Sequence, residues 1–222
     1  MFKFQERKNV QKEIYIEVIR IVAIILVIFN HTDGYFLYYS NTDSMLTWLF
    51  SFIGSVLCRL NVPLFVMITG ALILGKEESL RDLYQKRVRR IVLVLLLFTF
   101  FYYMLDIFRN SQKNFSLKDF IEGLLSGSIQ GSFWYLFLYL GILLVLPLLR
   151  KMAVSCENRE LRYFLLLQIV TVTGVGVFSC LTGMEVNSSI YLMNIYVYYL
   201  FAGYYLGKRI DMDRIPEWWV KG

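Results

Sequence analysis

The chain has 222 residues, 57% of them hydrophobic and 17% aromatic, and a mean hydropathy of +0.54. Apolar runs as long as these exceed the needs of a soluble core and predict an integral membrane protein in contact with membrane lipid. The net charge of +6 does not indicate nucleic-acid binding, because Lys and Arg gather in the short segments between apolar runs, and the three cysteines have neither disulfide nor metal-ligand spacing.

The first apolar segment, residues 14–31, contains three ionisable side chains. Glu17 and Arg20 lie near its beginning, and His31, the only histidine of the chain, ends it. In a helix the three positions share one face, and Arg20 and His31 stand roughly 16 Å apart along it. An ionisable side chain inside a membrane span is costly and predicts a functional site. Two alternatives remain open: His31 as an interfacial histidine, and Glu17 with Arg20 as a structural ion pair.

Further apolar segments predict an all-α, polytopic bundle of six transmembrane helices. The second segment contains Arg59, Asn61 and Pro63, which predict a kink or break, because proline disturbs the preceding turn. A charge beside a helix break is suited to lining a cavity, so Arg59 is a candidate substrate residue. Ser116 and Asp119 resemble a capping box that opens a short amphipathic helix, which we expect at the membrane surface. The six segments are 14–31, 46–74, 91–108, 133–149, 161–182 and 188–207.

Two further groups of residues flank apolar segments. Arg87 and Arg90 belong to a basic run before the third segment, where a role in fixing the orientation is one interpretation. Trp134 and Tyr135 open the fourth segment, where they form either an aromatic belt or a substrate platform.

The distribution of Lys and Arg predicts the orientation in the membrane. Of the 23 basic residues, 18 lie in 1–13, 75–90, 150–162 and 208–222, and three lie in 32–45, 109–132 and 183–187. The positive-inside rule therefore places both termini in the cytoplasm. Arg20 is then expected toward the cytoplasmic side and His31 near the outer face.

Five stretches occur in the order found in a known family. They are Glu17 and Arg20 followed by His31; VPLFVMITGALIL, 62–74; KRVRRIV, 86–92; FWYLFLYLGILLVLPLLRK, 133–151; and YLFAGYYLGKR, 199–209. Together they resemble the integral-membrane acyltransferase family 3, whose members O-acylate cell-surface polysaccharides and related glycans. The chain departs from the family pattern at Glu17, where Asp is usual, and at Thr69, where Ser is usual.

The resemblance implies an enzyme of the bacterial plasma membrane. It would move an acyl group, most often acetyl, from cytoplasmic acyl-coenzyme A to a hydroxyl of a cell-envelope glycan or lipid-linked sugar. His31, Arg20 and Glu17 would then be catalytic, and Arg87 and Arg90 would bind the coenzyme A phosphates. Imidazole suits this chemistry, since it accepts a hydroxyl proton near neutral pH.

The resemblance also concerns the extent of the chain. Family members have more spans than six, so residues 1–222 are expected to form a single membrane-embedded acyltransferase-like domain that is incomplete at the C-terminus. A transporter or sensor, with Arg20, Arg59 and His31 lining a substrate path, is the main alternative, although no convincing internal repeat supports it. A non-catalytic membrane domain is a third.

Overall fold

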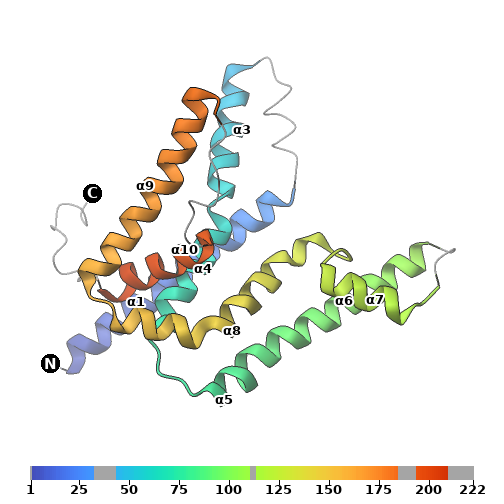
Figure 1. Cartoon of the computed structure of the whole chain (residues 1–222), viewed down its shortest axis with the longest axis horizontal. Helices are drawn as coiled ribbons and strands as arrows, with labels where there is room; N and C mark the ends of the chain where they lie inside the picture. Colours follow the sequence, from blue (N-terminus) through green and yellow to red (C-terminus); the bar gives the residue numbers. More distant parts are fainter. Residues whose placement is uncertain (1, 33–43, 111–113, 185–193, 210–222) are drawn as a thin grey trace. The chain divides into compact units, whose positions relative to one another are not determined.

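The computed structural model of the chain describes residues 2–32, 44–110, 114–184 and 194–209, with side chains from residue 14 onward. Every regular element in these ranges is a helix (Figure 1). The all-α class is therefore confirmed.

The helices form two compact units, which are described separately. Unit one contains Met1–Gly75 and Met152–Gly222, and unit two contains Lys76–Lys151. The elements of unit one are α1 (Phe2–Asn30), α3 (Met45–Cys58), α4 (Asn61–Thr69), η1 (Gly70–Leu74), α9 (Asn158–Thr182), α10 (Ile195–Tyr204) and η5 (Tyr205–Arg209). Those that begin in unit two are α5 (Leu80–Asp82), η2 (Leu83–Val88), α6 (Arg89–Arg109), α7 (Leu117–Ser126), η3 (Gly131–Phe133) and α8 (Trp134–Ser155). The expectation of one acyltransferase-like domain stays a prediction.

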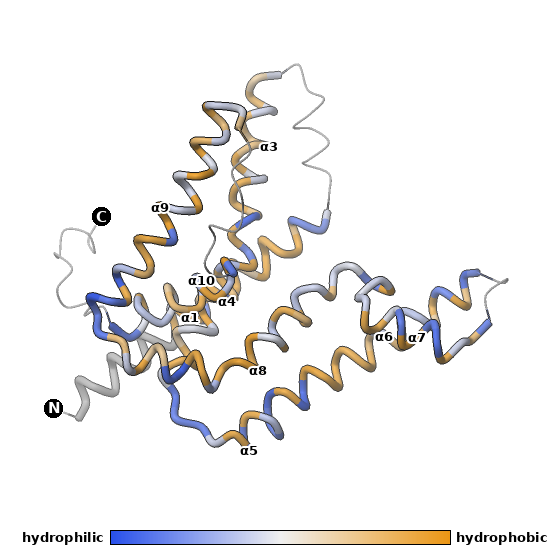
Figure 2. The backbone as a smooth tube through the Cα atoms, viewed as in Figure 1, coloured by the Kyte–Doolittle hydropathy of each residue, from blue (hydrophilic) through white to orange (hydrophobic). Residues whose placement is uncertain are grey.

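Four helical stretches of the described residues are long and apolar enough to cross a membrane. They are Met45–Leu74, Leu80–Arg109, Gly131–Ser155 and Asn158–Thr182, and they contain the second to fifth expected segments. Figure 2 shows apolar residues along α6, α8 and α9 and hydrophilic residues before α5 and at the start of α9. The first expected segment is helical as far as Asn30 but is not among the four. The sixth lies partly outside the described residues and is helical from Ile195.

The second membrane helix is broken where the sequence predicts it. α3 ends at Cys58, a turn follows at Arg59 and Leu60, and α4 begins at Asn61. The Asn61 Oδ1 accepts a hydrogen bond from the backbone N–H of Val62, which satisfies one donor of the new helix end. Pro63 lies in the first turn of α4. Proline is tolerated there, because its missing N–H would have no helical partner.

Two glycines let α4 and η1 cross α10 at very short range in unit one. A Cβ atom on Gly70 would collide with the carbonyl oxygen of Leu200, and one on Gly203 would collide with that of Met67. Small residues that let backbones approach are typical of helix contacts in membranes. α1 also packs against α4, so these helices form the core of unit one.

A hairpin of α6 and α7 closes one end of unit two. The Ser116 hydroxyl caps α7 by accepting a hydrogen bond from the Asp119 N–H at 3.3 Å, as expected from the sequence. Gly127, with φ of 68°, ends the helix in the left-handed conformation. The Tyr103 hydroxyl on α6 donates to the Ser116 carbonyl at 3.0 Å and accepts from its N–H at 3.1 Å, which ties the two helices together. The placement of α7 at the membrane surface stays a prediction.

The end of α8 that belongs to unit one is capped by a distant arginine. Arg209 donates from Nη2 to the carbonyl oxygens of Ala153, Val154 and Cys156 at 3.2–3.3 Å. Its guanidinium also lies 5.6 Å from the ring centroid of Tyr204. A cation at this position satisfies the last carbonyls of the helix and complements its dipole.

Candidate functional site

The charged face of α1 lies beside the buried side of the helix. Among the side chains described from residue 14 onward, Ile16 and Ala23 are buried, and Arg20 lies at the edge of their stripe with a side chain 37% exposed. Its Nη1 donates to the Glu17 Oε1 at 2.5 Å, so the ion pair expected from their spacing is present. The pair holds the guanidinium beside the buried side of α1, where it can polarise a neighbouring carbonyl or phosphate.

His31 occupies the turn that follows α1. Its backbone N–H donates to the carbonyl oxygens of Val27 and Ile28 at 3.2 and 3.1 Å, so the helical course continues up to it. The side chain is exposed. The helix therefore holds Arg20 and His31 on one face, as predicted, but it separates them by about 16 Å along the axis.

Glu78 gathers two arginines in unit two. The Nε of Arg87, in η2, donates to both Glu78 carboxylate oxygens at 3.1 and 3.2 Å, and the Nη2 of Arg150, on α8, donates to Oε2 at 2.8 Å. The side chains of Glu78 and Arg150 are 9% and 11% exposed, and that of Arg87 is 27% exposed. Arg90, one turn along the chain, is exposed on α6. The predicted phosphate-binding arginines thus belong to a larger charged cluster.

The surroundings of Glu78 keep its carboxyl group ionised. Burial alone raises its pKa, but the hydrogen bonds from Arg150 and Arg87, with the charges of the two arginines, outweigh burial and lower the pKa from 4.5. The contact between Glu78 and Arg150 also joins the 75–90 segment to the end of α8. The orientation of these segments in the membrane stays a prediction.

The predicted substrate residues belong to both units. Arg59 is exposed in the turn between α3 and α4 of unit one. In unit two, the rings of Trp134 and Tyr135 meet edge to face at 6.3 Å, and Tyr135 stacks on Tyr139 at the same centroid distance. Tyr139 lies within electrostatic range of Arg87 and Arg90, so α8 joins the aromatic pair to the basic cluster.

An apolar cavity of about 320 Å³ lies beside the charged face of α1. α1 contributes Ile16 and Ile19, and its other walls come from α4, η1, α10 and η5. The cavity is thus at most one helical turn from the ion pair of Glu17 and Arg20. Electrostatic interactions are stronger in such surroundings than in water.

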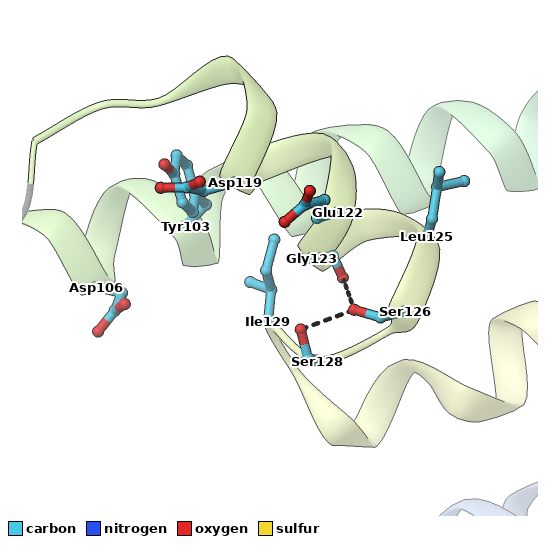
Figure 3. Close-up of a pocket in the computed structure, with 9 residues that line it drawn as sticks. All are labelled: Tyr103, Asp106, Asp119, Glu122, Gly123, Leu125, Ser126, Ser128 and Ile129. Atoms are coloured by element: carbon cyan, nitrogen blue, oxygen red, sulfur yellow. Dashed lines mark hydrogen bonds between the residues drawn. The ribbon is translucent and has the colours of Figure 1, made fainter.

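A polar cavity of about 970 Å³ lies against the hairpin of α6 and α7 (Figure 3). Its walls include Asp119, Glu122 and Tyr103, and the hydroxyl groups of Ser126 and Ser128 interact at 2.9 Å on one side. This cavity was not predicted from the sequence. No cluster of three or more His, Cys, Asp or Glu that could hold a metal ion occurs within the ranges the structure describes.

The chain has long apolar helices, a charged pair on α1 and a buried charged cluster in unit two. These features define a polytopic membrane protein with polar sites. The family model of the acyltransferase domain, acyltransferase family 3, matches residues 13–222. The chain belongs to this family and is a membrane acyltransferase, as the resemblance of the five stretches implies. Neither the curated proteins nor the solved structures gave a match.

Proposed function

We propose that the protein transfers an acetyl group from cytoplasmic acetyl-coenzyme A to a hydroxyl of a cell-envelope glycan or lipid-linked sugar, in a bacterial plasma membrane. The observation that carries this proposal is the course of α1. It is a continuous helix with an ion-paired arginine beside an apolar cavity and the only imidazole of the chain exposed at its end. These two groups provide a cation for the anionic donor and a base for the acceptor hydroxyl.

In the proposed reaction, neutral His31 accepts the proton of the acceptor hydroxyl. The hydroxyl oxygen attacks the thioester carbonyl carbon, and a tetrahedral oxyanion forms. Arg20, held by Glu17 about 16 Å from His31 along the axis of α1, binds a phosphate group of the donor and orients its thioester toward His31. Collapse of the intermediate forms the ester and breaks the carbon–sulfur bond. The coenzyme A thiolate leaves and takes up the proton that the imidazolium returns.

The remaining candidate residues serve binding in this proposal. Arg87 and Arg90 contact phosphate groups of the donor, for which guanidinium groups are suited by charge and by their hydrogen-bonding geometry. Arg59, Trp134 and Tyr135 contact the substrates. A carbohydrate ring packs well on an aromatic side chain that also has a polar group.

The test compares envelope glycans by mass spectrometry in cells that contain the wild-type protein, His31→Ala or Thr32→Ala. Loss of a positioned acid–base group lowers rates by about 100-fold or more, so we expect His31→Ala to reduce acylation on this scale at unchanged protein abundance. Thr32→Ala, a change at the neighbouring exposed residue, is expected to leave acylation intact. Normal acylation by His31→Ala at normal abundance would assign the catalytic base to another residue.

A further inference from the structure

The three members of the Glu78 cluster differ in how far they are buried. Glu78 and Arg150 are about nine-tenths covered, whereas Arg87 has about a quarter of its side chain exposed. Glu78 and Arg150 therefore form the inner pair, and Arg87 is the member that an incoming ligand can touch. Its neighbour on α6, Arg90, is also exposed.

The contact with Glu78 leaves Arg87 able to bind a second anion. Both carboxylate oxygens accept from the same nitrogen of Arg87, its Nε. A guanidinium has five N–H donors, so its terminal amino groups can donate to a phosphate while Nε stays in place. A side chain that is already fixed also loses less conformational freedom when a ligand binds.

The charge balance of the cluster favours an anion. A single pair of arginine and glutamate would be neutral, but here two guanidinium groups share one carboxylate, which leaves an excess positive charge. Arg150 offsets the charge of Glu78, so Glu78 can hold Arg87 without cancelling its attraction for a phosphate. The lowered pKa of Glu78 means that the carboxylate is present at neutral pH.

We propose that Glu78 is a positioning residue for donor binding, which, together with Arg150, holds Arg87 where it meets a phosphate group of coenzyme A. Glu78 itself does not contact the donor. This inference rests on the proposed function, because it takes the donor to be a coenzyme A thioester. It adds two residues, Glu78 and Arg150, whose effect on the donor passes through Arg87.

The test is a double-mutant cycle on the dissociation constant of coenzyme A for the full chain in lipid nanodiscs. Arg87→Gln and Glu78→Gln are each expected to weaken binding by roughly tenfold, the scale of one charge-assisted hydrogen bond. If Glu78 acts through Arg87, the double variant binds only about tenfold more weakly than wild type, since the two effects are not additive. Glu77→Gln, on the same loop at an exposed position, is the matched control and is expected to bind as wild type does.

Two results would overturn the inference while leaving the proposed function standing. One is unchanged affinity of Glu78→Gln, and the other is an additive loss of roughly a hundredfold in the double variant, which indicates independent roles. If wild type itself does not bind coenzyme A, the proposed donor is wrong and the inference is wrong with it.

A further variant covers the case in which Glu78→Gln folds poorly. Glu78→Gln with Arg150→Gln removes the two inner charges together, so that the Glu78–Arg150 contact is not left with a charge on one side only. This variant is expected to bind coenzyme A as weakly as Arg87→Gln does. Binding equal to wild type would show that Arg87 needs no anchor and would overturn the inference.

Discussion

Glu78 is the residue whose ionisation links the stability of unit two to pH. Its pKa in the folded protein is below 4.5, so the unfolded chain binds the proton more readily. The stabilisation is therefore fully present above about pH 4.5 and is lost as the pH falls through the lower, folded pKa.

We expect Glu78→Gln to lower the free energy of unfolding by about 3 kcal/mol at neutral pH, because it removes the carboxylate that faces the largely buried guanidinium of Arg150. We also expect the variant to lose less stability than wild type on acidification below about pH 4.5. Thermal unfolding in detergent across this pH range measures both effects. Parallel pH profiles for the two proteins would show that Glu78 does not contribute to acid sensitivity.

At the residue scale, local pairs were predictable from the sequence and distant ones were not. The pair of Glu17 and Arg20 follows from a spacing of three on a helix. Arg150 is 72 residues from Glu78, and no periodicity relates the two positions. Arg150 belongs to the basic segment 150–162, so the positive-inside rule accounted for its charge without identifying Glu78 as its partner.

At the scale of elements, the crossing of α4 with α10 depends on the absence of a side chain. Gly203→Ala places a Cβ against the Met67 carbonyl oxygen, a backbone atom that cannot move without shifting α4. We expect a loss of about 3 kcal/mol, at the upper end for overpacking, because backbone cannot relax as a side chain does. Gly174→Ala, in α9 where a Cβ meets nothing within 4 Å, is the control, and alanine there is expected to be neutral or stabilising.

The melting temperatures of both variants in detergent distinguish these outcomes. Equal melting temperatures would mean that the helices separate readily at this crossing.

The sequence predicted the break at Arg59, because Pro63 limits where a helix can start, and it predicted the cap at Ser116. The π-helical segments η1, η2 and η5 were not predicted, since they depend on packing between helices and not on a local residue pattern.

At the scale of the whole molecule, the orientation in the membrane is the quantity most open to test. After Cys58, Cys156 and Cys180 are replaced by serine, Asp33→Cys is expected to react from outside with an impermeant thiol reagent, and Arg159→Cys is not. The reason is the excess of basic residues on the predicted cytoplasmic segments, 18 against three. If only Arg159→Cys were labelled in intact cells, the orientation would be the opposite of the predicted one.

The fold class was predictable because the backbone has to satisfy its own hydrogen bonds in a bilayer, and a long apolar segment does so as a helix. The number of membrane spans was harder to predict, because α1 is a long helix that contains charged side chains. The division into two compact units was not predicted, since it reflects which helices touch and not where apolar residues lie.

The arginine cap on α8 also has a consequence for the order of events during synthesis. Arg209 follows the carbonyl groups that it caps by 53 to 56 residues. At about 5–20 residues per second, the ribosome adds Arg209 about 3–10 s after the end of α8 has been made. During this interval the last carbonyl groups of α8 have only water as a hydrogen-bond donor in place of Arg209. The conformation of this helix end is therefore not fixed until the polypeptide beyond α10 has been made.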